Sequence, residues 1–411
     1  MSWPTTKLKW AATTIAGGTP SVSDPAYWEE DDKNGLDWIS ISDMSGRTSV
    51  AATGRRVSMD GIRAARLPIG NPGTLIMSMY ASLGHTAFLT KRASWNQAIL
   101  GIIPSITHDV RFLKYALEKI KPTLTEIARS NTQANLNAEQ VGNLVIPNPP
   151  LEEQRRIADF LDTETARVDA LVKAYERVKS LASERSQTVI DAEIDREPAD
   201  TPLRYIVRFR EGPGIMAVDF QQHGVPLIRI SGLQEGEVTL RGCNFLSPEK
   251  AARQWHHFRL QLGDRLISGS ATMGSVSIVR DPEVVGSIPY TGLIILRPAR
   301  SGVEMDYVEA FLKSSRFSRQ IDVLKTGATM QHFGPTHLSQ VQASLPSVEN
   351  QRRVIAKVGD ALRFSGQVTR LANRQIALLT ERRQALITAA VTGQFDVSTA
   401  SGRNVTDGVS A

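Results

Sequence analysis

The sequence predicts an α+β protein in which two mixed α/β globules stand in tandem, separated and followed by long helices that pair as an antiparallel coiled coil. The main observation is an internal repeat, because residues 152–157 read Glu-Glu-Gln-Arg-Arg-Ile and residues 349–354 read Glu-Asn-Gln-Arg-Arg-Val. Each copy follows a Pro-containing apolar segment and begins a long, charged run without interior proline. This pattern indicates a tandem duplication, and we expect the function to be carried out twice.

Three pairs of segments upstream of the repeat also match between the two halves. The pairs are residues 38–44 with 227–233, residues 73–78 with 263–268, and residues 98–104 with 292–298. Short β-branched runs bounded by Gly and Pro are typical of strands. We therefore expect one globule at residues 1–150 and the other at residues 198–347.

The two charged runs predict long helices at residues 151–197 and 348–397. Apolar residues recur in both runs at steps of three and four, which is the pattern of a coiled-coil seam. The first seam consists of Ile157, Leu161, Val168, Leu171, Tyr175, Val178, Ala182 and Val189. The second consists of Val354, Val358, Ala361, Val368, Ala372, Leu379 and Leu386. Neither helix buries its seam alone, so we expect an antiparallel pair. The alternative is that each helix packs on its own globule or on a second copy of the chain.

Composition sets the limits of the functional interpretation. The chain of 411 residues is long enough for two or three cores. Its single cysteine, Cys243, cannot form an intrachain disulfide, which favours the cytoplasm, and no stretch is apolar enough for a membrane span or a signal peptide. The net charge of +6 permits a nucleic-acid partner without demanding one. Residues 398–411 are small, polar and aperiodic, and predict a disordered tail.

The sequence contains no constellation of residues typical of catalysis. Asn148-Pro149-Pro150 resembles the tetrapeptide with which amino-methyltransferases hold a target base, but Leu151 stands where an aromatic ring is needed. Glycine-containing segments lack the spacing and the lysine of a phosphate-binding loop. His256-His257 has no metal ligand at a suitable spacing, and we expect these two side chains to point to opposite sides of a strand. We therefore expect no catalytic residue and no metal site.

Polar residues between the apolar segments predict a recognition surface instead. Two loops rich in hydroxyl groups, residues 78–84 and 268–274, follow matching strands. Hydroxyls and backbone amides suit phosphate contacts, while Arg, Asn and Gln read base edges. Each residue taken alone fits a solvated face or a turn cap equally well. The DNA-binding candidates are Ser40, Ser42, Ser78, Tyr80, Ser82, Lys91, Arg92, Gln133, Asn135, Arg229, Ser231, Ser268, Ser270, Thr272, Arg280, Gln331 and His332.

The order of these features resembles the specificity subunit of type I restriction–modification systems. The motifs that carry the resemblance are Pro-Leu-Glu-Glu-Gln-Arg-Arg-Ile at residues 150–157, its second copy at residues 348–354, and Val-Thr-Gly-Gln-Phe-Asp at residues 391–396. The resemblance covers essentially the whole chain. It implies a non-catalytic subunit in which each globule is a target recognition domain that reads one half of a bipartite DNA sequence.

The resemblance also implies a role for the helices, which would set the gap between the half-sites and dock two modification (methyltransferase) subunits. The partner and spacer candidates on these helices are Gln154, Arg155, Leu161, Val168, Leu171, Tyr175, Val178, Gln351, Arg352, Val358, Val368, Leu379 and Leu386. In such a complex the modification subunits use S-adenosylmethionine to methylate adenine at N6. Restriction subunits use ATP and Mg to cut foreign DNA. No cofactor is expected in this chain.

Two other interpretations remain open from the sequence. One is a stand-alone restriction enzyme, which would need a catalytic motif that the sequence lacks. The other is a coiled-coil scaffold whose globules bind protein rather than DNA. Salt-dependent, sequence-selective DNA binding distinguishes the recognition subunit from the scaffold.

Overall fold

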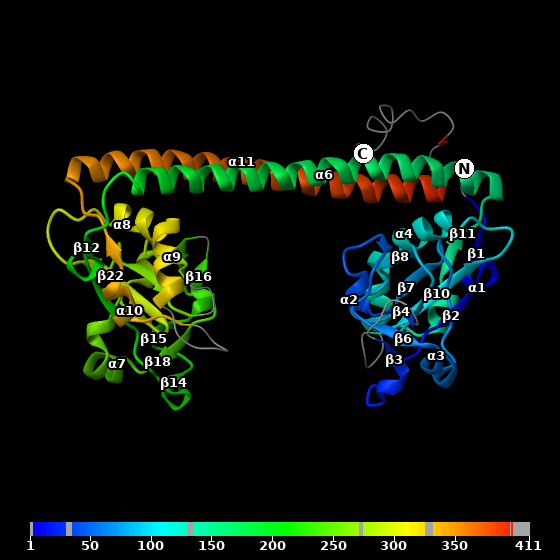
Figure 1. Cartoon of the computed structure of the whole chain (residues 1–411), viewed down its shortest axis with the longest axis horizontal. Coiled ribbons are helices and arrows are strands. Elements are labelled where there is room, and N and C mark those ends of the chain that lie inside the picture. The colour runs from blue at the N-terminus through cyan, green and yellow to red at the C-terminus, as the bar shows by residue number, and fades with distance from the viewer. Residues whose placement is uncertain are drawn as a thin grey trace. The chain divides into compact units, whose positions relative to one another are not determined.

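The computed structural model describes residues 3–29, 35–129, 135–234, 236–270, 274–324, 332–394 and 396–397. The predicted tail and three of the DNA-binding candidates, Gln133, Thr272 and Gln331, lie outside these residues. The chain divides into two compact units (Figure 1). Unit 1 comprises Met1–Tyr175 and Arg374–Ala411, and unit 2 comprises Glu176–Asn373. Each unit therefore contains one globule and one segment of each long helix.

Unit 1 is built on a five-stranded main sheet and a four-stranded small sheet. The main sheet has the order β2 (Ala12–Ala16), β10 (Ile99–Pro104), β7 (Leu75–Ser78), β8 (Thr86–Leu89), β5 (Ser49–Val50). The small sheet has the order β3 (Trp28–Glu29), β6 (Arg56–Ser58), β4 (Gly35–Ile39), β9 (Ala93–Trp95). A separate pair joins β1 (Thr5–Lys7) to β11 (Val145–Pro147). The helices of this globule are α1 (Leu8–Ala11), α2 (Ile41–Met44), α3 (Met59–Ala65), α4 (Val110–Arg129) and α5 (Ala138–Gly142).

Unit 2 repeats this arrangement. Its main sheet has the order β13 (Val207–Glu211), β22 (Leu293–Pro298), β19 (Arg265–Ser268), β20 (Val276–Ile278), β17 (Glu237–Val238), β16 (Leu233–Gln234). Its small sheet has the order β14 (Phe220–Gln221), β18 (Asn244–Leu246), β15 (Val225–Ile228), β21 (Ile288–Pro289). A separate pair joins β12 (Thr201–Pro202) to β23 (Gln342–Ala343). The helices are α7 (Pro248–Gln254), α8 (Met305–Leu312), α9 (Ser315–Leu324) and α10 (Pro335–Gln340).

Strand register shows that the two units are copies at the level of single residues. Ser78 of β7 pairs with Ile99 of β10, and Ser268 of β19 pairs with Leu293 of β22. In both small sheets two antiparallel pairings are followed by one parallel pairing. The segments that match in the sequence are therefore equivalent strands, which confirms the duplication.

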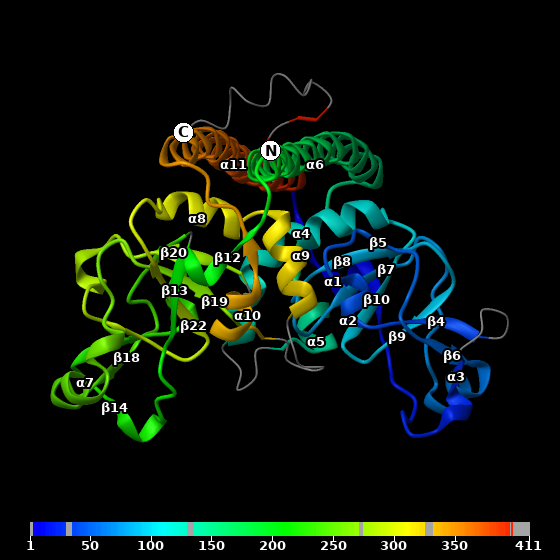
Figure 2. The same cartoon turned by 60° about the vertical axis from the view of Figure 1, so that its left-hand side comes forward.

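Strand β10 of the unit 1 sheet, which lies between β2 and β7, is apolar along most of its length because both of its faces are covered. Leu100 and Ile102 belong to the core beneath α4, whereas Ile99 packs with Trp95 on the other face. Gly101 is required between them, since a Cβ atom there would lie 2.4 Å from the ring of Trp95. In each unit the small sheet lies on the side of the globule away from the long-helix segments, whereas α4 or α8 lies next to those segments (Figures 1 and 2).

The long helices are α6 (Leu151–Ile194, 44 residues) and α11 (Val348–Thr392, 45 residues). α11 stops at Gly393, whose φ of 72° favours glycine, and Gln394 N donates to Ala389 O. Within unit 2, Glu193 of α6 binds Arg353 and Lys357, and Arg185 lies over the ring of Phe364. Numbering therefore rises along one helix as it falls along the other, which confirms the antiparallel pairing.

The seam of α6 differs from the predicted one at two positions. The predicted seam residues Leu171 and Val178 are 48% and 45% exposed. The residues that follow them, Val172 and Lys179, are less exposed and take their positions in the seam. The prediction selected the seam positions by their apolar character. A helix turns by about 100° per residue, so a residue one position away from the seam points out of it. The Lys179 side chain is only 25% exposed, and its Nζ atom lies 2.9 Å from Glu176 Oε2, so the charged end is paired while the aliphatic stem is largely covered. The predicted seam of α11 is confirmed, with Val354, Val358 and Ala372 almost fully buried.

Glu193 is a buried charged link between the helices in unit 2. Its side chain is 6% exposed and lies 2.7 Å from Arg353 Nη1 and 3.1 Å from Lys357 Nζ. Burial alone would raise the pKa of Glu193, but the hydrogen bonds from Lys357 and Arg353 and the nearby charge of Arg196 lower it overall. The ionised form is therefore favoured, and it stabilises the helix pair.

Two fully buried glutamines explain why the repeat motif is so similar in both halves. Gln154 Oε1 accepts from Asp109 N at 2.9 Å, and its Nε2 donates to Pro149 O at 2.9 Å and to Thr107 O at 3.4 Å. Gln351 Oε1 accepts from Glu304 N at 2.9 Å, and its Nε2 donates to Gly302 O at 2.8 Å and to Pro346 O at 2.9 Å. We call each set of contacts a glutamine clasp. Each clasp fixes the start of a long helix to the start of the globule helix α4 or α8.

We predict that Gln154→Ala destabilises unit 1 and that Gln351→Ala destabilises unit 2, each by about 2–4 kcal/mol, because buried backbone groups lose their partners. Hydrogen exchange measured by mass spectrometry reports each unit separately and should show faster exchange in α4 or α8, respectively. Gln375→Ala and Gln367→Ala are matched controls, since both side chains are exposed on α11. Unchanged exchange in α4 and α8 would contradict the role of the clasps.

We also predict that Glu193→Gln lowers the stability of unit 2 at pH 7 by about 1–3 kcal/mol, because the charged partners lose their carboxylate. The folded-state pKa is lowered from about 4.5, so the stabilisation is complete above about pH 5 and is lost as the pH falls through the lowered value. The difference between variant and wild type in hydrogen exchange of α11 should therefore shrink at acid pH. Glu184→Gln, at an exposed ion pair on α6, is the control. An equal difference at both pH values would refute the assignment.

Candidate nucleic-acid interface

The described ends of the two hydroxyl-rich loops make the same contacts in both units. Ser78 is fully buried, and its Oγ donates to Tyr80 O at 2.5 Å. Ser268 is likewise buried, and its Oγ donates to Ser270 O at 2.6 Å. Each loop closes through a glycine at positive φ, because Gly84 N donates to Ser78 O and Gly274 N donates to Ser268 O, both at 2.9 Å. These two serines therefore shape the loops from inside, whereas Tyr80 and Ser82 of unit 1 are exposed and Ser270 of unit 2 is partly exposed.

The structure brings the segment that carries the candidate Asn135 or His332 onto each loop. In unit 1, Leu136 N donates to Met79 O at 3.1 Å, which places Asn135 beside the exposed Tyr80 and Ser82. In unit 2, Phe333 N donates to Gly269 O at 2.9 Å, which places the exposed His332 beside Ser270. A Cβ atom on Gly269 would lie 2.2 Å from Phe333 O, so glycine is required for this approach. Segments about fifty to sixty residues apart in sequence thus form one polar cluster in each unit.

Four more candidates follow the small-sheet strands β4 and β15. Ser40 Oγ donates to Asp43 Oδ2 at 2.6 Å and lies 2.7 Å from Ser42 Oγ, so this pair is tied into the start of α2. At the equivalent position in unit 2, Arg229 donates to Asn244 Oδ1 at 2.8 Å and lies over the ring of Tyr290. Ser231 Oγ makes a longer contact with Arg241 O, at 3.4 Å. This corner is polar in both units, and unit 2 carries Arg229 at the position where unit 1 carries Ser40.

The remaining candidates lie on exposed turns after β8 and β20. Lys91 and Arg92 are exposed between β8 and β9. The Arg280 side chain is 66% exposed, and its Nη1 lies 3.8 Å from Glu237 Oε1. Leu89 and Val279 are equivalent, because Gly73 N donates to Leu89 O as Gly263 N donates to Val279 O. Arg280, the residue after Val279, is therefore equivalent to Thr90. The same turn therefore carries positive charge in both units.

The partner and spacer candidates fall into three groups. Gln154 and Gln351 form the clasps and are not accessible to a partner in this structure. The largely buried seam positions are Leu161, Val168, Val358 and Leu386, while Tyr175, Val368 and Leu379 are partly exposed. The exposed candidates are Arg155, which binds Glu152, Arg352, which binds Glu304, and the two residues displaced from the seam, Leu171 and Val178.

Exposed apolar residues of α11 were missed by the sequence interpretation. Leu362, Phe364, Leu371 and Leu378 are 36%, 47%, 64% and 49% exposed and lie outside the predicted seam. The signal was present as apolar residues next to the predicted seam positions. A regular seam explains only one stripe of a helix, so apolar residues outside it indicate a second contact surface.

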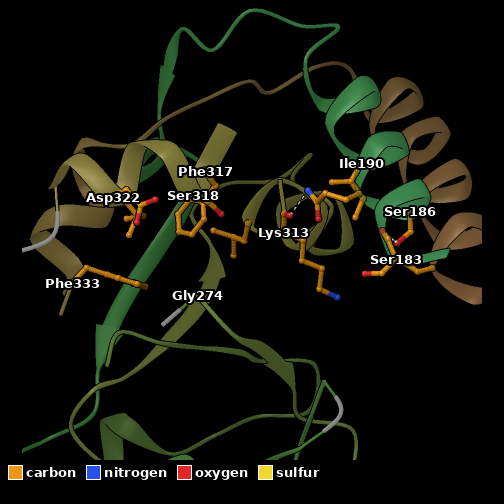
Figure 3. A pocket seen from close by; sticks show the side chains of 13 residues that line it. Ser183, Ser186, Ile190, Gly274, Lys313, Phe317, Ser318, Asp322 and Phe333 are labelled. Carbon is orange, nitrogen blue, oxygen red and sulfur yellow. Dashed lines mark hydrogen bonds between the residues drawn. The ribbon is translucent and has the colours of Figure 1, made fainter. Parts of the chain in front are cut away.

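A cavity of about 370 Å³ lies in unit 2 where the end of α6 meets the globule (Figure 3). Ser183, Ser186 and Ile190 line it from α6, and Gly274 of the hydroxyl-rich loop lines it from the globule. Gln187 Nε2 donates to Lys313 O at 3.1 Å across this junction. The cavity therefore connects the long helix to the candidate recognition loop of the same unit.

The described residues contain no group of three or more His, Cys, Asp or Glu side chains that could hold a metal ion. His256 and His257 lie in a 3-10 turn and not in a strand, so that expectation was wrong; Trp255 and Phe258, which pack in the small-sheet core, set the turn. Asn148 is part of the linker into α6, because its Oδ1 pairs with His108 Nε2 at 3.0 Å and its N donates to Pro4 O. In the described part of the chain, no helix has the length and apolar character needed to cross a membrane.

Comparisons with known proteins confirm the resemblance seen in the sequence. Residues 3–178 match the family model of the type I restriction modification DNA specificity domain. The type I restriction enzyme EcoBI specificity subunit of Escherichia coli is 22% identical over 400 residues, which are 88% of this chain and 81% of that protein. The MjaIX specificity subunit of Methanocaldococcus jannaschii is 21% identical over 268 residues, 60% of this chain and 61% of that protein.

A solved chain of a type I restriction–modification system, from work on complex assembly and conformational transition, has the same fold. Its TM-score is 0.72 at 18% identity, and the match covers 96% of this chain and 98% of that chain. The fold class predicted from the sequence is therefore confirmed. The family model ends at residue 178, but unit 2 repeats the strand order and register of unit 1.

Proposed function

We infer that this chain, which resembles the type I restriction–modification specificity subunits over most of its length, is the DNA sequence-recognition subunit of a type I restriction–modification complex. The observation that carries the inference is the duplication. Both units have the same strand order, apart from the additional edge strand β16 of unit 2, and each brings its hydroxyl-rich loop together with the segment that carries Asn135 or His332. As a specificity subunit the chain is non-catalytic.

Each globule acts as a target recognition domain that reads one half of a bipartite DNA sequence. A single small globule contacts few base pairs, whereas two linked globules add their binding energies. The clusters around Tyr80 and Asn135 in unit 1 and around Ser270 and His332 in unit 2 supply the donors and acceptors needed for base and phosphate contacts. The equivalent loops of the two units carry different side chains, and this difference is the expected basis for recognition of two different half-sites.

The helices α6 and α11 set the gap between the half-sites and dock two modification subunits. The seam and the clasps bury most of the inner residues, so the exposed apolar residues beside the seam remain for a partner. These residues are Leu171, Val178, Leu371 and Leu378. In the full complex, restriction subunits join the modification subunits.

The chemistry belongs to those partners. S-adenosylmethionine would bind the modification subunits, which methylate adenine at N6, and ATP and Mg would bind the restriction subunits. The target base must leave the DNA stack before methylation, and we assign that step to the modification subunit. The present chain would contribute the position at which these reactions take place.

The decisive experiment is co-expression of the chain with a modification subunit from the same system, followed by single-molecule sequencing for N6-methyladenine. A split motif, with two short halves around a fixed gap, is the expected result. An intact complex that methylates no such motif would contradict the recognition function. It would favour the alternative of a coiled-coil scaffold whose globules bind protein.

We predict that deletion of residues 172–178 together with residues 372–378 shortens the recognised gap by about three base pairs. Seven residues remove about 10 Å of helix, and about two full turns keep the helical phase nearly unchanged. The two deleted segments lie opposite each other, as judged from the pairings of Glu193 with Arg353 in unit 2 and of Asp169 with Arg383 in unit 1. Methylation mapping measures the gap.

Deletion of residues 172–178 alone is the control for this experiment. It breaks the register of the helix pair and should abolish methylation without creating a new motif. An unchanged gap in the double deletion, with unchanged half-sites, would show that the helices do not set the spacing.

A further inference from the structure

The duplication allows each surface position of one unit to be compared with its equivalent in the other. Equivalence follows from register, because Thr13 pairs with Ile103 as Arg208 pairs with Arg297. The loops after β10 and β22 are also equivalent, since Ser105 N donates to Ala11 O as Ala299 N donates to Ile206 O. The turn before β7 matches the turn before β19 through Gly73 and Gly263, which have φ values of 86° and 84°.

One face near the edge strand of the main sheet differs sharply between the units. Unit 1 presents uncharged residues there, and four of them are isoleucines that are 37%, 37%, 38% and 96% exposed. The unit 1 residues are Thr13, Ile15, Ile69, Ile103 and Ile106. The equivalent unit 2 residues are Arg208, Arg210, Arg259, Arg297 and Arg300. Five arginines thus stand where the duplicate has a hydroxyl group and four isoleucines.

Three of these five arginines line a groove of about 460 Å³ in unit 2. Arg208 and Arg210 line it from the edge strand β13, and Arg297 lines it from β22. The turn at Leu262 and the start of α8 at Met305 complete the walls. We call this feature the arginine groove.

The charge of the arginine groove is only partly neutralised. Arg297 donates to both oxygens of Asp264, at 2.7 and 2.6 Å, and these hydrogen bonds raise the pKa of Arg297 despite its partial burial. Arg208 donates to the backbone carbonyl of Ala299, and Arg210 to that of His257. Within the described part of the chain, neither Arg208 nor Arg210 forms an ion pair with a carboxylate. The groove therefore keeps a net positive charge.

The fold does not require these arginines. Unit 1 forms the same strands in the same register with Thr13, Ile15 and Ile103. Like charges directly opposite each other on a sheet are destabilising, and Arg208 stands opposite Arg297. A cluster that costs stability and is absent from the duplicate indicates a ligand with negative charge.

We propose that the arginine groove binds the phosphate backbone of duplex DNA beside the half-site read by unit 2. The proposal rests on the DNA-recognition function inferred above and assigns an additional contact surface to one unit only. A guanidinium group binds phosphate with two parallel hydrogen bonds. One nitrogen of Arg208 and one of Arg210 donate to backbone carbonyls, and these hydrogen bonds hold both guanidinium groups at the groove. Arg208 and Arg210 are successive residues on one face of a strand, and such residues lie about 7 Å apart. This spacing suits a ligand with negative charges at regular intervals.

Phosphate contacts carry no sequence information of their own. The arginine groove therefore strengthens binding without changing the bases that are read. It also makes DNA binding by unit 2 more dependent on salt than binding by unit 1, because each phosphate contact releases counterions.

The test uses the full chain with the substitutions Arg208→Gln and Arg210→Gln, singly and together. Affinity is measured as a function of salt for a duplex with the mapped target and for a duplex of scrambled sequence. Each substitution should reduce the slope of log affinity against log salt by about 0.9, and the double variant by about 1.8, on both duplexes. The methylated motif should stay the same.

Arg319→Gln is the matched control, because Arg319 is exposed on α9, whose Phe317 packs against the opposite face of the same sheet. Its salt slope should equal that of the wild type. Arg208→Thr installs the residue of unit 1 and serves as a second variant whose fold is already realised in the duplicate. Thermal unfolding of each variant verifies that unit 2 is folded.

Unchanged salt slopes in folded variants, with target binding intact, would overturn the arginine groove and leave the recognition function standing. Unchanged slopes combined with loss of a partner subunit would also overturn it, in favour of an acidic protein as the ligand. A wild-type chain without any sequence-selective DNA binding or methylated motif would overturn the recognition function and the arginine groove together.

Discussion

The glutamine clasp is the contact on which the rest of each unit depends. Gln154 and Gln351 are fully buried, and each satisfies three backbone groups that would otherwise be unpaired. Each clasp joins the first turn of a long helix to the residue that begins α4 or α8. Because those globule helices cover the main sheet, the clasp fixes the direction in which each long helix leaves its globule. The motif repeated in the sequence is thus a structural joint, and this explains why its glutamine must be the same in both halves.

A common framework with different surfaces follows from this joint. The two main sheets keep the same strand order and register, and the two hydroxyl-rich loops close through equivalent glycines. Side chains that point outward are free to differ, as the isoleucines of unit 1 and the arginines of unit 2 demonstrate. Such a division suits a protein that reads two unlike DNA half-sites, since recognition needs variable side chains on a fixed backbone.

The sequence predicted most of the segments that form the candidate site, but it predicted few of the contacts between them. The loops at residues 78–84 and 268–274 were identified because hydroxyl groups follow an apolar strand. However, the burial of Ser78 and Ser268 depends on closure by Gly84 and Gly274, which no local pattern reveals. The approach of Leu136 to Met79 and of Phe333 to Gly269 joins segments far apart in the chain. The arginine groove was also hidden, because its residues come from three separate segments of the chain.

The sequence by itself determined the duplication, the two sheet-bearing globules and the two long helices, and it favoured their antiparallel pairing. These features rest on repeated motifs and on hydrophobic periodicity, which are local properties. Tertiary structure alone decided that Gln154 and Gln351 are buried, that Lys179 and not Val178 lies in the seam, and that Arg208, Arg210 and Arg297 line one groove. Burial and proximity depend on which distant segments pack together. A residue's neighbours along the chain do not contain that information.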